Sequence, residues 1–275
     1  LMILYRWVLF RLMLGAGLIK LRAAGCWQDL TCLYSHFETQ PIPNPLSGFF
    51  HYAPQWFLKG GVMINHFCEL VVPWFLFLPS PMQAFAGVAF VLFQLSIMVG
   101  GNYGWINFLT LLMTIPCFHD GFWGALATAK LREKIARLKK IARPGEFQTI
   151  LIVSLSILIL FLSDQPIRNL LSSQQVMNRS YDRLHLVNSY GMFGGVTKVR
   201  REIVIEGTRD EKITENTLWQ AYELPCKPGD PTVMPCVRSP YHDRLTWQIW
   251  FAAMGPPQNS PWLIHFMYKL LKGEE

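Results

Sequence analysis

Residues 82–100 read MQAFAGVAFVLFQLSIMVG, a run of 19 residues that contains no Asp, Glu, Lys or Arg. A transmembrane helix needs about 20 apolar residues, because the hydrocarbon core of a bilayer is about 30 Å thick and each helical residue rises about 1.5 Å. This run has both the length and the composition for such a helix. It therefore predicts that the chain crosses a membrane.

Four further runs share this character, and all of them lie in the first 165 of the 275 residues. They are 1–19 (LMILYRWVLFRLMLGAGLI), 62–78 (VMINHFCELVVPWFLFL), 105–118 (WINFLTLLMTIPCF) and 149–163 (TILIVSLSILILFLS). A soluble protein with a large helical core is the alternative, but five such runs would leave too little polar surface to cover them. We therefore predict a polytopic α-helical membrane domain, residues 1–165, with about five transmembrane helices.

The charges suggest how this domain is oriented. The net charge is +7, and because the basic residues cluster beside apolar runs, membrane topology explains them better than a nucleic-acid partner, which we do not expect. Residues 130–143, KLREKIARLKKIAR, have seven Lys or Arg against one Glu, as in a cytoplasmic loop. By alternation, loop 20–61 and the domain 166–275 lie on the luminal or extracellular side. Lys20 and Arg22 are exceptions to the charge rule in this layout.

The predicted topology places two pairs of cysteines in an oxidising compartment, where thiols form disulfides. The stretch CKPGDPTVMPC, residues 226–236, has a turn-forming centre between its cysteines. Closing a loop of about ten residues stabilises a fold by roughly 3 kcal/mol on the chain-entropy model. A metal clip would need two further ligands nearby. Four cysteines allow three pairings, of which we favour Cys26 with Cys32 and Cys226 with Cys236.

Asn178 begins the sequon Asn178-Arg179-Ser180, which lies 15 residues past the last apolar run. The pattern marks an acceptor for N-glycosylation when it reaches the lumen. We therefore predict a glycan on Asn178, in agreement with the topology.

Three polar residues, Asn65, His66 and Glu69, lie inside the apolar run 62–78. His66 and Glu69 are three residues apart and share one helix face. Ionisable groups within a membrane segment are costly and suggest a function. We favour a structural clamp, with Arg6 or Arg11 of the first run as partner. A catalytic acid–base pair and exposure at the membrane interface are the alternatives.

Loop 20–61 contains His36, Glu38 and His51, which together could bind a metal ion. Three prolines between residues 41 and 45 make this segment extended and rich in turns. A structured loop lying over the helices explains it without a metal. We expect neither a metal nor a cofactor.

The domain 166–275 contains patterns for strands and for amphipathic helices. REIVIEG (201–207) and TLWQAYEL (217–224) alternate apolar and polar residues and predict a β-rich core. RLTWQIWFAAMG (244–255) and SPWLIHFMYKLLKG (260–273) predict helices, the second with a Ser-Pro start and a Gly end. Their aromatic residues serve the core or a binding surface. The candidates for partner contact are Trp247, Trp250 and Trp262.

Long strings of this chain resemble the lipase maturation factors. They include RWVLFRLMLGAGLIKLRAAGCWQDLTCLYSHFETQPIPNPLS, NHFCELVVPWFLFL, LHLVNSYGMFGGVTKVRREIVIEGT and PCVRSPYHDRLTWQIWFAA. The paired cysteines and the SPYH run favour the first of the family's two paralogues. The resemblance implies a multi-pass protein of the endoplasmic reticulum membrane that assists folding and assembly of secreted homodimeric lipases of the lipoprotein lipase type. It assigns no catalytic residues.

The resemblance and the residues together predict a folding factor whose partners are dimeric lipases, the bilayer and other folding factors of the endoplasmic reticulum. Its luminal β-rich domain and loop 20–61 would hold apolar surface of a lipase until dimerisation buries it. The alternative is a membrane-embedded enzyme that acts on a lipid or a protein side chain, with His66 and Glu69 as base and acid. Such an enzyme needs a cavity where these two groups converge.

Overall fold

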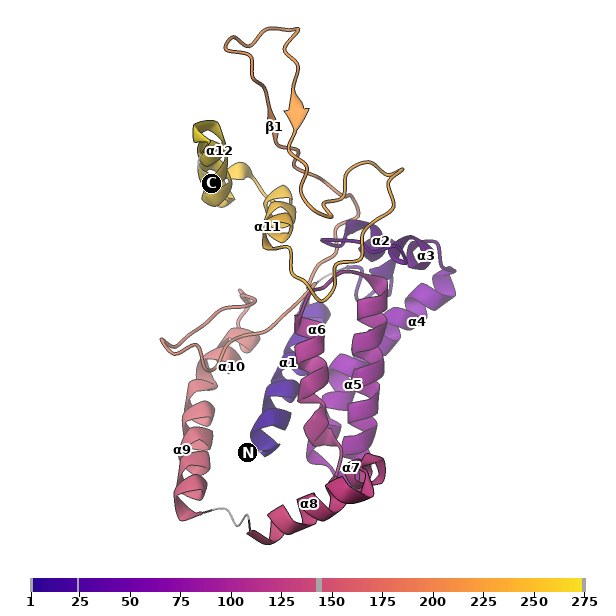
Figure 1. The fold of residues 1–275 in the computed structure, drawn as a ribbon, viewed down its shortest axis with the longest axis vertical. Coiled ribbons are helices and arrows are strands. Elements are labelled where there is room, and N and C mark those ends of the chain that lie inside the picture. Colours follow the sequence, from indigo (N-terminus) through magenta and orange to yellow (C-terminus); the bar gives the residue numbers. More distant parts are fainter. Residues whose placement is uncertain (1, 24, 142–144, 274–275) are drawn as a thin grey trace. The chain divides into compact units, whose positions relative to one another are not determined.

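The computed structural model describes residues 2–23, 25–141 and 145–273 and is mainly helical (Figure 1). Its α-helices are α1 (Met2–Arg22), α2 (Leu33–Thr39), α3 (Ser47–His51), α4 (Gln55–His66), α5 (Ser80–Gly100), α6 (Ile106–Met113), α7 (Asp120–Leu126), α8 (Ala129–Ile141), α9 (Glu146–Leu162), α10 (Asp164–Leu171), α11 (Arg244–Ala253) and α12 (Pro261–Lys272). A π-helical turn, η1 (Phe67–Val71), and three 3₁₀ turns, η2 (Val72–Phe77), η3 (Ile115–Cys117) and η4 (Pro257–Asn259), complete the helices. The strands are β1 (Glu206–Gly207) and β2 (Gln220–Ala221).

The chain divides into two compact units, each assembled from segments that are far apart in sequence. Unit 1 consists of Leu1–Cys32, Trp56–Leu95 and Leu109–Gly195. Unit 2 consists of Leu33–Gln55, Ser96–Phe108 and Val196–Glu275. The predicted boundary at residue 165 separates a membrane domain from a luminal domain, whereas these units are defined by compactness. The predicted boundary therefore stays a prediction.

Among the described residues, four helices are long and apolar enough to cross a membrane. They are Met2–Arg22, Gln55–Phe77, Ser80–Gly100 and Glu146–Leu171. The fifth predicted run, residues 105–118, forms the shorter apolar helix Ile106–Cys117, and its crossing of the membrane stays a prediction. Twelve residues rise only about 18 Å, and the helix is interrupted at Thr114 before Pro116.

Two predicted loops differ from the structure. The second candidate span begins at Gln55 rather than at residue 62, so the predicted loop 20–61 is shorter and contains α2 and α3. The predicted basic loop 130–143 is largely the helix α8, and its residues 142 and 143 lie outside the described residues. An uninterrupted run of good helix formers explains the second difference.

In unit 1, α1 packs closely against the turns η1 and η2. Gly17 makes this approach possible, because a Cβ atom there would lie 2.7 Å from Leu70 Cδ2 and 2.9 Å from Glu69 Cβ. About two turns nearer the N-terminus, Phe10 of α1 makes edge contacts with Trp74 at 5.0 Å and Phe77 at 5.2 Å between ring centroids. The π-helical turn ends two residues before Pro73, which has no N–H for the helical ladder.

Unit 2 contains very little sheet, so the predicted β-rich core is wrong for the described residues. The two strands pair Glu206 with Ala221 and Gly207 with Gln220, antiparallel, and Tyr222 N donates to Ile205 O at 2.8 Å. The pattern identified the two segments that pair but overestimated the length of the ladder. Next to the start of the first segment, the side chain of Arg200 contacts a distant part of the chain, as described below.

The two predicted C-terminal helices are confirmed as α11 and α12. Ser260 and Pro261 stand at the start of α12, and Gly273 ends it in the left-handed conformation at φ 65°. The inward faces of both helices are apolar, with Ile249 of α11 almost fully buried and Leu263 of α12 buried. Unit 2 is therefore held by helices and long-range side-chain contacts rather than by a sheet.

Candidate functional site

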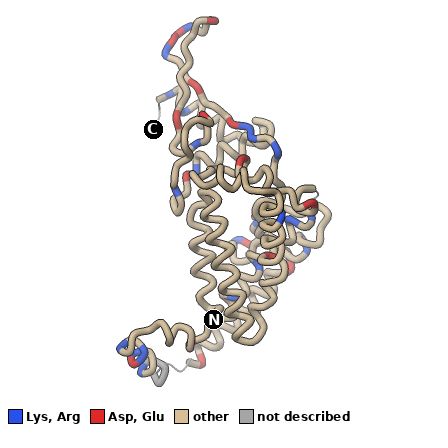
Figure 2. The backbone as a smooth tube through the Cα atoms, turned by 90° about the vertical axis from the view of Figure 1, so that its right-hand side faces the viewer, with Lys and Arg blue, Asp and Glu red and all other residues tan. Residues whose placement is uncertain are grey.

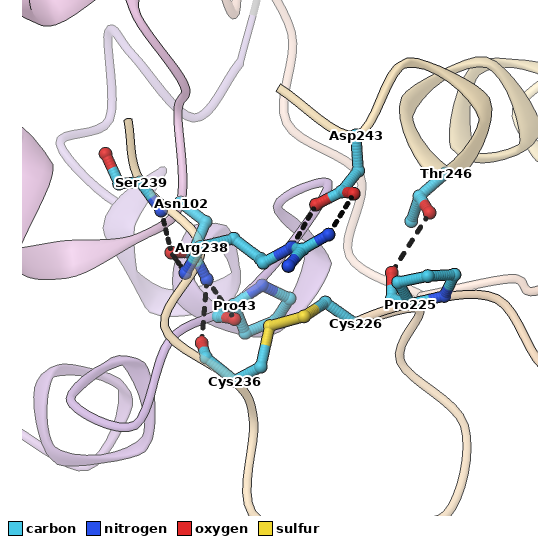
Figure 3. Close-up of a disulfide and its surroundings, with 9 residues drawn as sticks. All are labelled: Pro43, Asn102, Pro225, Cys226, Cys236, Arg238, Ser239, Asp243 and Thr246. Atoms are coloured by element: carbon cyan, nitrogen blue, oxygen red, sulfur yellow. Dashed lines mark hydrogen bonds and ion pairs between the residues drawn. A yellow bond between two sulfur atoms is a disulfide. The ribbon is translucent and has the colours of Figure 1, made fainter. Parts of the chain in front are cut away.

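Two disulfides join the cysteines in the pairing that the sequence favours. In unit 2, Cys226 is bonded to Cys236, with 5.6 Å between the Cα atoms (Figure 3). In unit 1, Cys26 is bonded to Cys32, with 4.6 Å between the Cα atoms. Both separations lie in the ordinary range for disulfides. The first of them stands beside a buried polar side chain of unit 2 that makes four hydrogen bonds.

That side chain is Asn102, which lies in the turn between α5 and α6 and is only 3% exposed. Its Nδ2 donates to Pro43 O at 3.0 Å and to Cys236 O at 2.9 Å (Figure 3). Its Oδ1 accepts from the backbone N–H of Arg238 at 2.9 Å and of Ser239 at 3.1 Å. Both amide donors and both acceptor positions are thus used, and three separate chain segments meet at one residue.

Arg238 fixes the segment that leads from the disulfide into α11. Its guanidinium donates to both carboxylate oxygens of Asp243, from Nε at 3.0 Å and from Nη2 at 3.1 Å (Figure 3). These hydrogen bonds and the negative charge of Asp243 raise the pKa of Arg238. Asp243 precedes the first turn of α11, where a negative charge is favourable next to the helix dipole. The disulfide and this ion pair together set the start of α11.

The segment that contains α2 and α3 is held to the rest of unit 2 by its own backbone carbonyls. Arg200 donates to Glu38 O at 2.8 Å and to Pro41 O at 3.1 Å. Trp250 of α11 donates from Nε1 to Thr39 O at 2.9 Å. Arg200 also pairs with Glu202 at 2.6 Å. Arg200 therefore ties the start of the predicted strand segment to this loop.

A second set of contacts joins this segment to the end of α5. Gln40 donates from Nε2 to Gly100 O at 3.0 Å, and Ser47 Oγ donates to the same carbonyl at 2.8 Å. Asn44 donates from Nδ2 to Val99 O at 2.9 Å. Because α5 ends at Gly100, its last carbonyls have no partner within the helix. The side chains of the loop supply those partners.

His36, Glu38 and His51, which could bind a metal by residue type, make contacts within this loop and with Tyr103. His36 Nε2 lies 2.8 Å from the hydroxyl of Tyr103, and His51 Nε2 lies 3.9 Å from Glu38 Oε2. Burial raises the pKa of Tyr103 well above its usual range, so its hydroxyl stays protonated and donates to Gln40 Oε1. Among the described residues, no group of three or more His, Cys, Asp or Glu is placed to hold a metal.

The three tryptophans proposed for partner contact lie in different surroundings. Trp247 is buried, with 7% of its surface exposed. Its ring makes an edge-to-face contact with that of Trp250, with 6.2 Å between ring centroids. Trp250 and Trp262 are half-buried. Trp247 therefore supports the surface of unit 2 from beneath rather than forming it. Whether Trp250 or Trp262 contacts a partner stays a prediction.

The exposed apolar surface of unit 2 is carried by other residues, which the sequence analysis did not single out. On α12, four apolar side chains at the spacing i, i+3, i+4, i+7 form an exposed stripe. This outer stripe of α12 consists of Ile264, Met267, Tyr268 and Leu271, and Leu271 is 87% exposed. The same spacing is visible in the sequence and would have predicted a second apolar face.

A cavity of about 170 Å³ lies under α11 and α12 in unit 2. Its lining is Ile203, Val204, Ile205, Tyr222, Glu223, Leu224, Lys227, Ile249, Phe266 and Leu270. Small-molecule sites usually have roughly 300–1,000 Å³, so this cavity is smaller than a typical ligand site. Lys227 is bound to Glu202 at 2.9 Å. The lining and the size are those of an imperfectly filled core rather than of a substrate pocket.

Unit 1 contains a buried ion pair between α1 and η1. Lys20 Nζ donates to both oxygens of Glu69, at 2.6 and 2.7 Å. The two side chains are only 6% and 5% exposed. A buried charge is tolerated only when it is paired and hydrogen-bonded. Lys20, which was an exception to the charge rule, is thus explained as the partner of the one acidic residue of the second candidate span.

His66 and Glu69 bind different partners and do not form an acid–base pair. His66 Nε2 lies 3.0 Å from Trp27 O, and Trp27 donates from Nε1 to Phe193 O at 2.9 Å. Lys20 Nζ also lies 4.9 Å from the centre of the Trp27 ring. Trp27 therefore links the ion pair and the imidazole. Every one of these contacts positions one segment against another.

The predicted arginine partners of Glu69 are wrong. Arg6 donates to Pro116 O at 3.0 and 2.8 Å, and Arg11 donates to Asn188 O at 2.5 Å. Both arginines satisfy backbone carbonyls rather than the carboxylate. Asn65, the third polar candidate, is buried in α4. A clamp between α1 and η1 is present, but its cation is Lys20.

Asn178 is exposed and lies in a turn, with φ at 53°. Its Nδ2 donates to Gly191 O at 2.9 Å, and Gly191 N donates back to its Oδ1 at 3.3 Å. Asn accepts this left-handed conformation more readily than most residues do. An exposed turn is a suitable place for a glycan, and the modification of Asn178 stays a prediction.

Comparison with known proteins identifies two matching family regions. Residues 1–125 match a family model described as the lipase maturation factor transmembrane domain. Residues 186–275 match one described as the lipase maturation factor C-terminal domain. The second region begins within unit 1 and includes all of the C-terminal segment of unit 2.

Similar curated proteins cover nearly all of this chain. Lipase maturation factor 1 of Homo sapiens is 43% identical over 98% of the chain and 50% of its own length. The protein of that name from Mus musculus is 41% identical with the same coverage. Lipase maturation factor 2 of Xenopus laevis is 29% identical over 99% of the chain and 52% of its own length. The chain thus spans about half the length of these relatives. No solved structure matches it.

Proposed function

We propose, on the premise that the chain belongs to the lipase maturation factor family, that it takes part in the folding and assembly of secreted homodimeric lipases. The observation that carries this proposal is the similarity to lipase maturation factor 1 over 98% of the chain. Membership of the family and four candidate membrane spans support a location in the endoplasmic reticulum membrane. In this proposal unit 2 faces the lumen and α8 faces the cytoplasm.

The surface that we propose for the lipase is the outer stripe of α12. Its four side chains are exposed and apolar, as a surface needs to be in order to cover apolar area on a partly assembled protein. The disulfide Cys226–Cys236 and the hydrogen bonds of Asn102 support this role because they hold the start of α11. A rigid scaffold lowers the entropy lost on binding.

The proposal contains no catalytic step and no cofactor. Glu69 is bound by Lys20, and His66 contacts the carbonyl of Trp27, so both polar candidates have structural partners. The lipase would be released when its own dimerisation buries the surface that the stripe had covered. Other folding factors of the endoplasmic reticulum remain candidate partners of the same complex.

The test is lipase secretion from cells that lack their own maturation factor. We expect Ile264→Ser combined with Leu271→Ser to lower the secreted lipase activity per mole of folded factor at least tenfold. The matched control is Leu218→Ser, because Leu218 is 85% exposed in unit 2 but is not part of α12. A photo-crosslinking residue at Met267 should trap lipase monomers. Equal activity of the double variant and the control, with no crosslink, would reject this surface.

A further inference from the structure

The helix α8 has an amphipathic surface that the proposed function does not use. Within Ala129–Ile141 there are six Lys or Arg and one Glu, and Figure 2 shows this concentration of basic residues. All side chains from residue 129 to 137 are exposed. The family matches end at residue 125 and resume at 186, so α8 lies between them.

The apolar and basic residues of α8 occupy different faces. Leu131 and Ile135 are four residues apart, so they lie on one face, although they are 47% and 39% exposed. Glu133 lies on the other side of the helix and pairs with Arg137 at 2.6 Å. Lys130 and Lys134 are also exposed. An apolar stripe bordered by Lys and Arg is typical of helices that lie in the surface of a membrane.

The chain itself holds α8 close to a bilayer. The next helix, α9, begins at Glu146 and is part of the candidate span Glu146–Leu171. Five peptide units separate Ile141 from Glu146, and a fully extended chain covers about 3.5 Å per unit, or roughly 17 Å in total. The end of α8 therefore cannot leave the surface region of the membrane that α9 crosses.

We propose that α8 docks on the surface of that bilayer, with Leu131 and Ile135 at the boundary between headgroups and acyl chains and its basic residues on anionic lipid phosphates. The charge of the helix is complementary to such a surface. A Lys or Arg near an anionic membrane changes the ratio of docked to undocked helix by about fivefold. Three such residues together therefore change it by roughly a hundredfold.

The experiment uses the full chain in vesicles of phosphatidylcholine, alone or mixed with phosphatidylserine. A fluorescent label is attached to Leu131→Cys, Ile135→Cys or Glu133→Cys in separate samples, since the free Cys68 and Cys117 are buried. Quenching by spin-labelled lipid and by aqueous iodide is then measured for each position. In the mixed vesicles, we expect lipid to quench the labels at 131 and 135, and iodide to quench the label at 133.

Replacing Lys130, Lys134 and Arg137 by Gln should abolish this contrast, which is the difference in quenching between the labels at 131 and 135 and the label at 133. The matched control neutralises three exposed basic residues of unit 2, Arg201, Arg209 and Lys212, and should leave it unchanged. Equal access of iodide to all three positions in mixed vesicles would overturn the proposal. So would labels at 131 and 135 that are shielded from iodide but not quenched by lipid, because a protein surface would then cover the stripe. Retention of the contrast after neutralisation would also overturn it.

Discussion

Replacing Asn102 by Ala should loosen unit 2 where its three segments meet. The change removes four hydrogen bonds, to Pro43 O and Cys236 O and from the N–H groups of Arg238 and Ser239. Each is worth about 1 kcal/mol net. Water that enters the space left by the side chain restores part of this, so we expect a loss of roughly 3 kcal/mol in the free energy of local opening.

Hydrogen exchange followed by mass spectrometry on the full chain in detergent measures this loss. A cost of about 3 kcal/mol corresponds to roughly a hundredfold faster exchange of the amides of Arg238 and Ser239. Asn102→Asp keeps the acceptor for the two N–H groups but turns an oxygen of a buried carboxylate toward the carbonyls of Pro43 and Cys236. We expect it to speed exchange at least as much as Asn102→Ala, because a buried charge without a cation is costly.

The matched control is Asn216→Ala, at an exposed position of the same unit. Exposed substitutions usually change stability by less than about 0.5 kcal/mol, so exchange at Arg238 and Ser239 should stay as in the wild type. The reasoning is refuted if Asn102→Ala leaves these two amides protected. It is also refuted if exchange rises equally in unit 1, since the effect would then be global rather than located at the junction.

Three further outcomes are expected. Lys20→Met leaves Glu69 buried without its cation and should lower the free energy of unfolding by about 3–5 kcal/mol. The double variant Lys20→Met, Glu69→Leu should recover most of this loss in thermal melts. Equal melting temperatures of the single and double variants would show that the lost ion pair does not cause the destabilisation. Replacing Cys226 and Cys236, which are 10 residues apart, by Ser should cost about 3 kcal/mol, and non-reducing peptide mapping should find these two cysteines linked in the wild type. Asn178→Gln should remove a glycan and increase the mobility of cell-expressed protein on gels, and an unchanged mobility would contradict the proposed luminal placement of this turn.

Features that depend on residues close together in sequence could be predicted. The run 82–100 became α5, Ser80–Gly100, because length and lack of charge are enough to indicate a spanning helix. The two disulfides join cysteines only 6 and 10 residues apart. The limits of α12 follow from a Ser-Pro start and a Gly end. Each of these signals is complete within about 20 residues.

Features that depend on a distant partner could not be predicted. Lys20 and Glu69 are 49 residues apart, and the sequence showed two buried charges without showing that they meet. Asn102 bonds to Pro43 and Cys236, 59 and 134 residues away. The alternation in residues 201–207 predicted a longer strand than β1, and it did not show that Arg200 binds carbonyls about 160 residues away. Pattern identifies a buried face, and only the fold selects its partner.

The contacts of unit 2 also show that the C-terminal family region is not a self-sufficient structural unit. Residues 186–275 match it, yet Arg200 and Trp250 within it donate to carbonyls of residues 38, 39 and 41. The N–H groups of Arg238 and Ser239 are satisfied by Asn102. Separated from residues 33–55 and 96–108, the region would leave these donors without their acceptors. The segments 33–55 and 96–108 therefore complete the C-terminal region. A substitution in either segment can alter the position of the disulfide-bonded segment, because Asn102 joins Pro43 O to Cys236 O by hydrogen bonds.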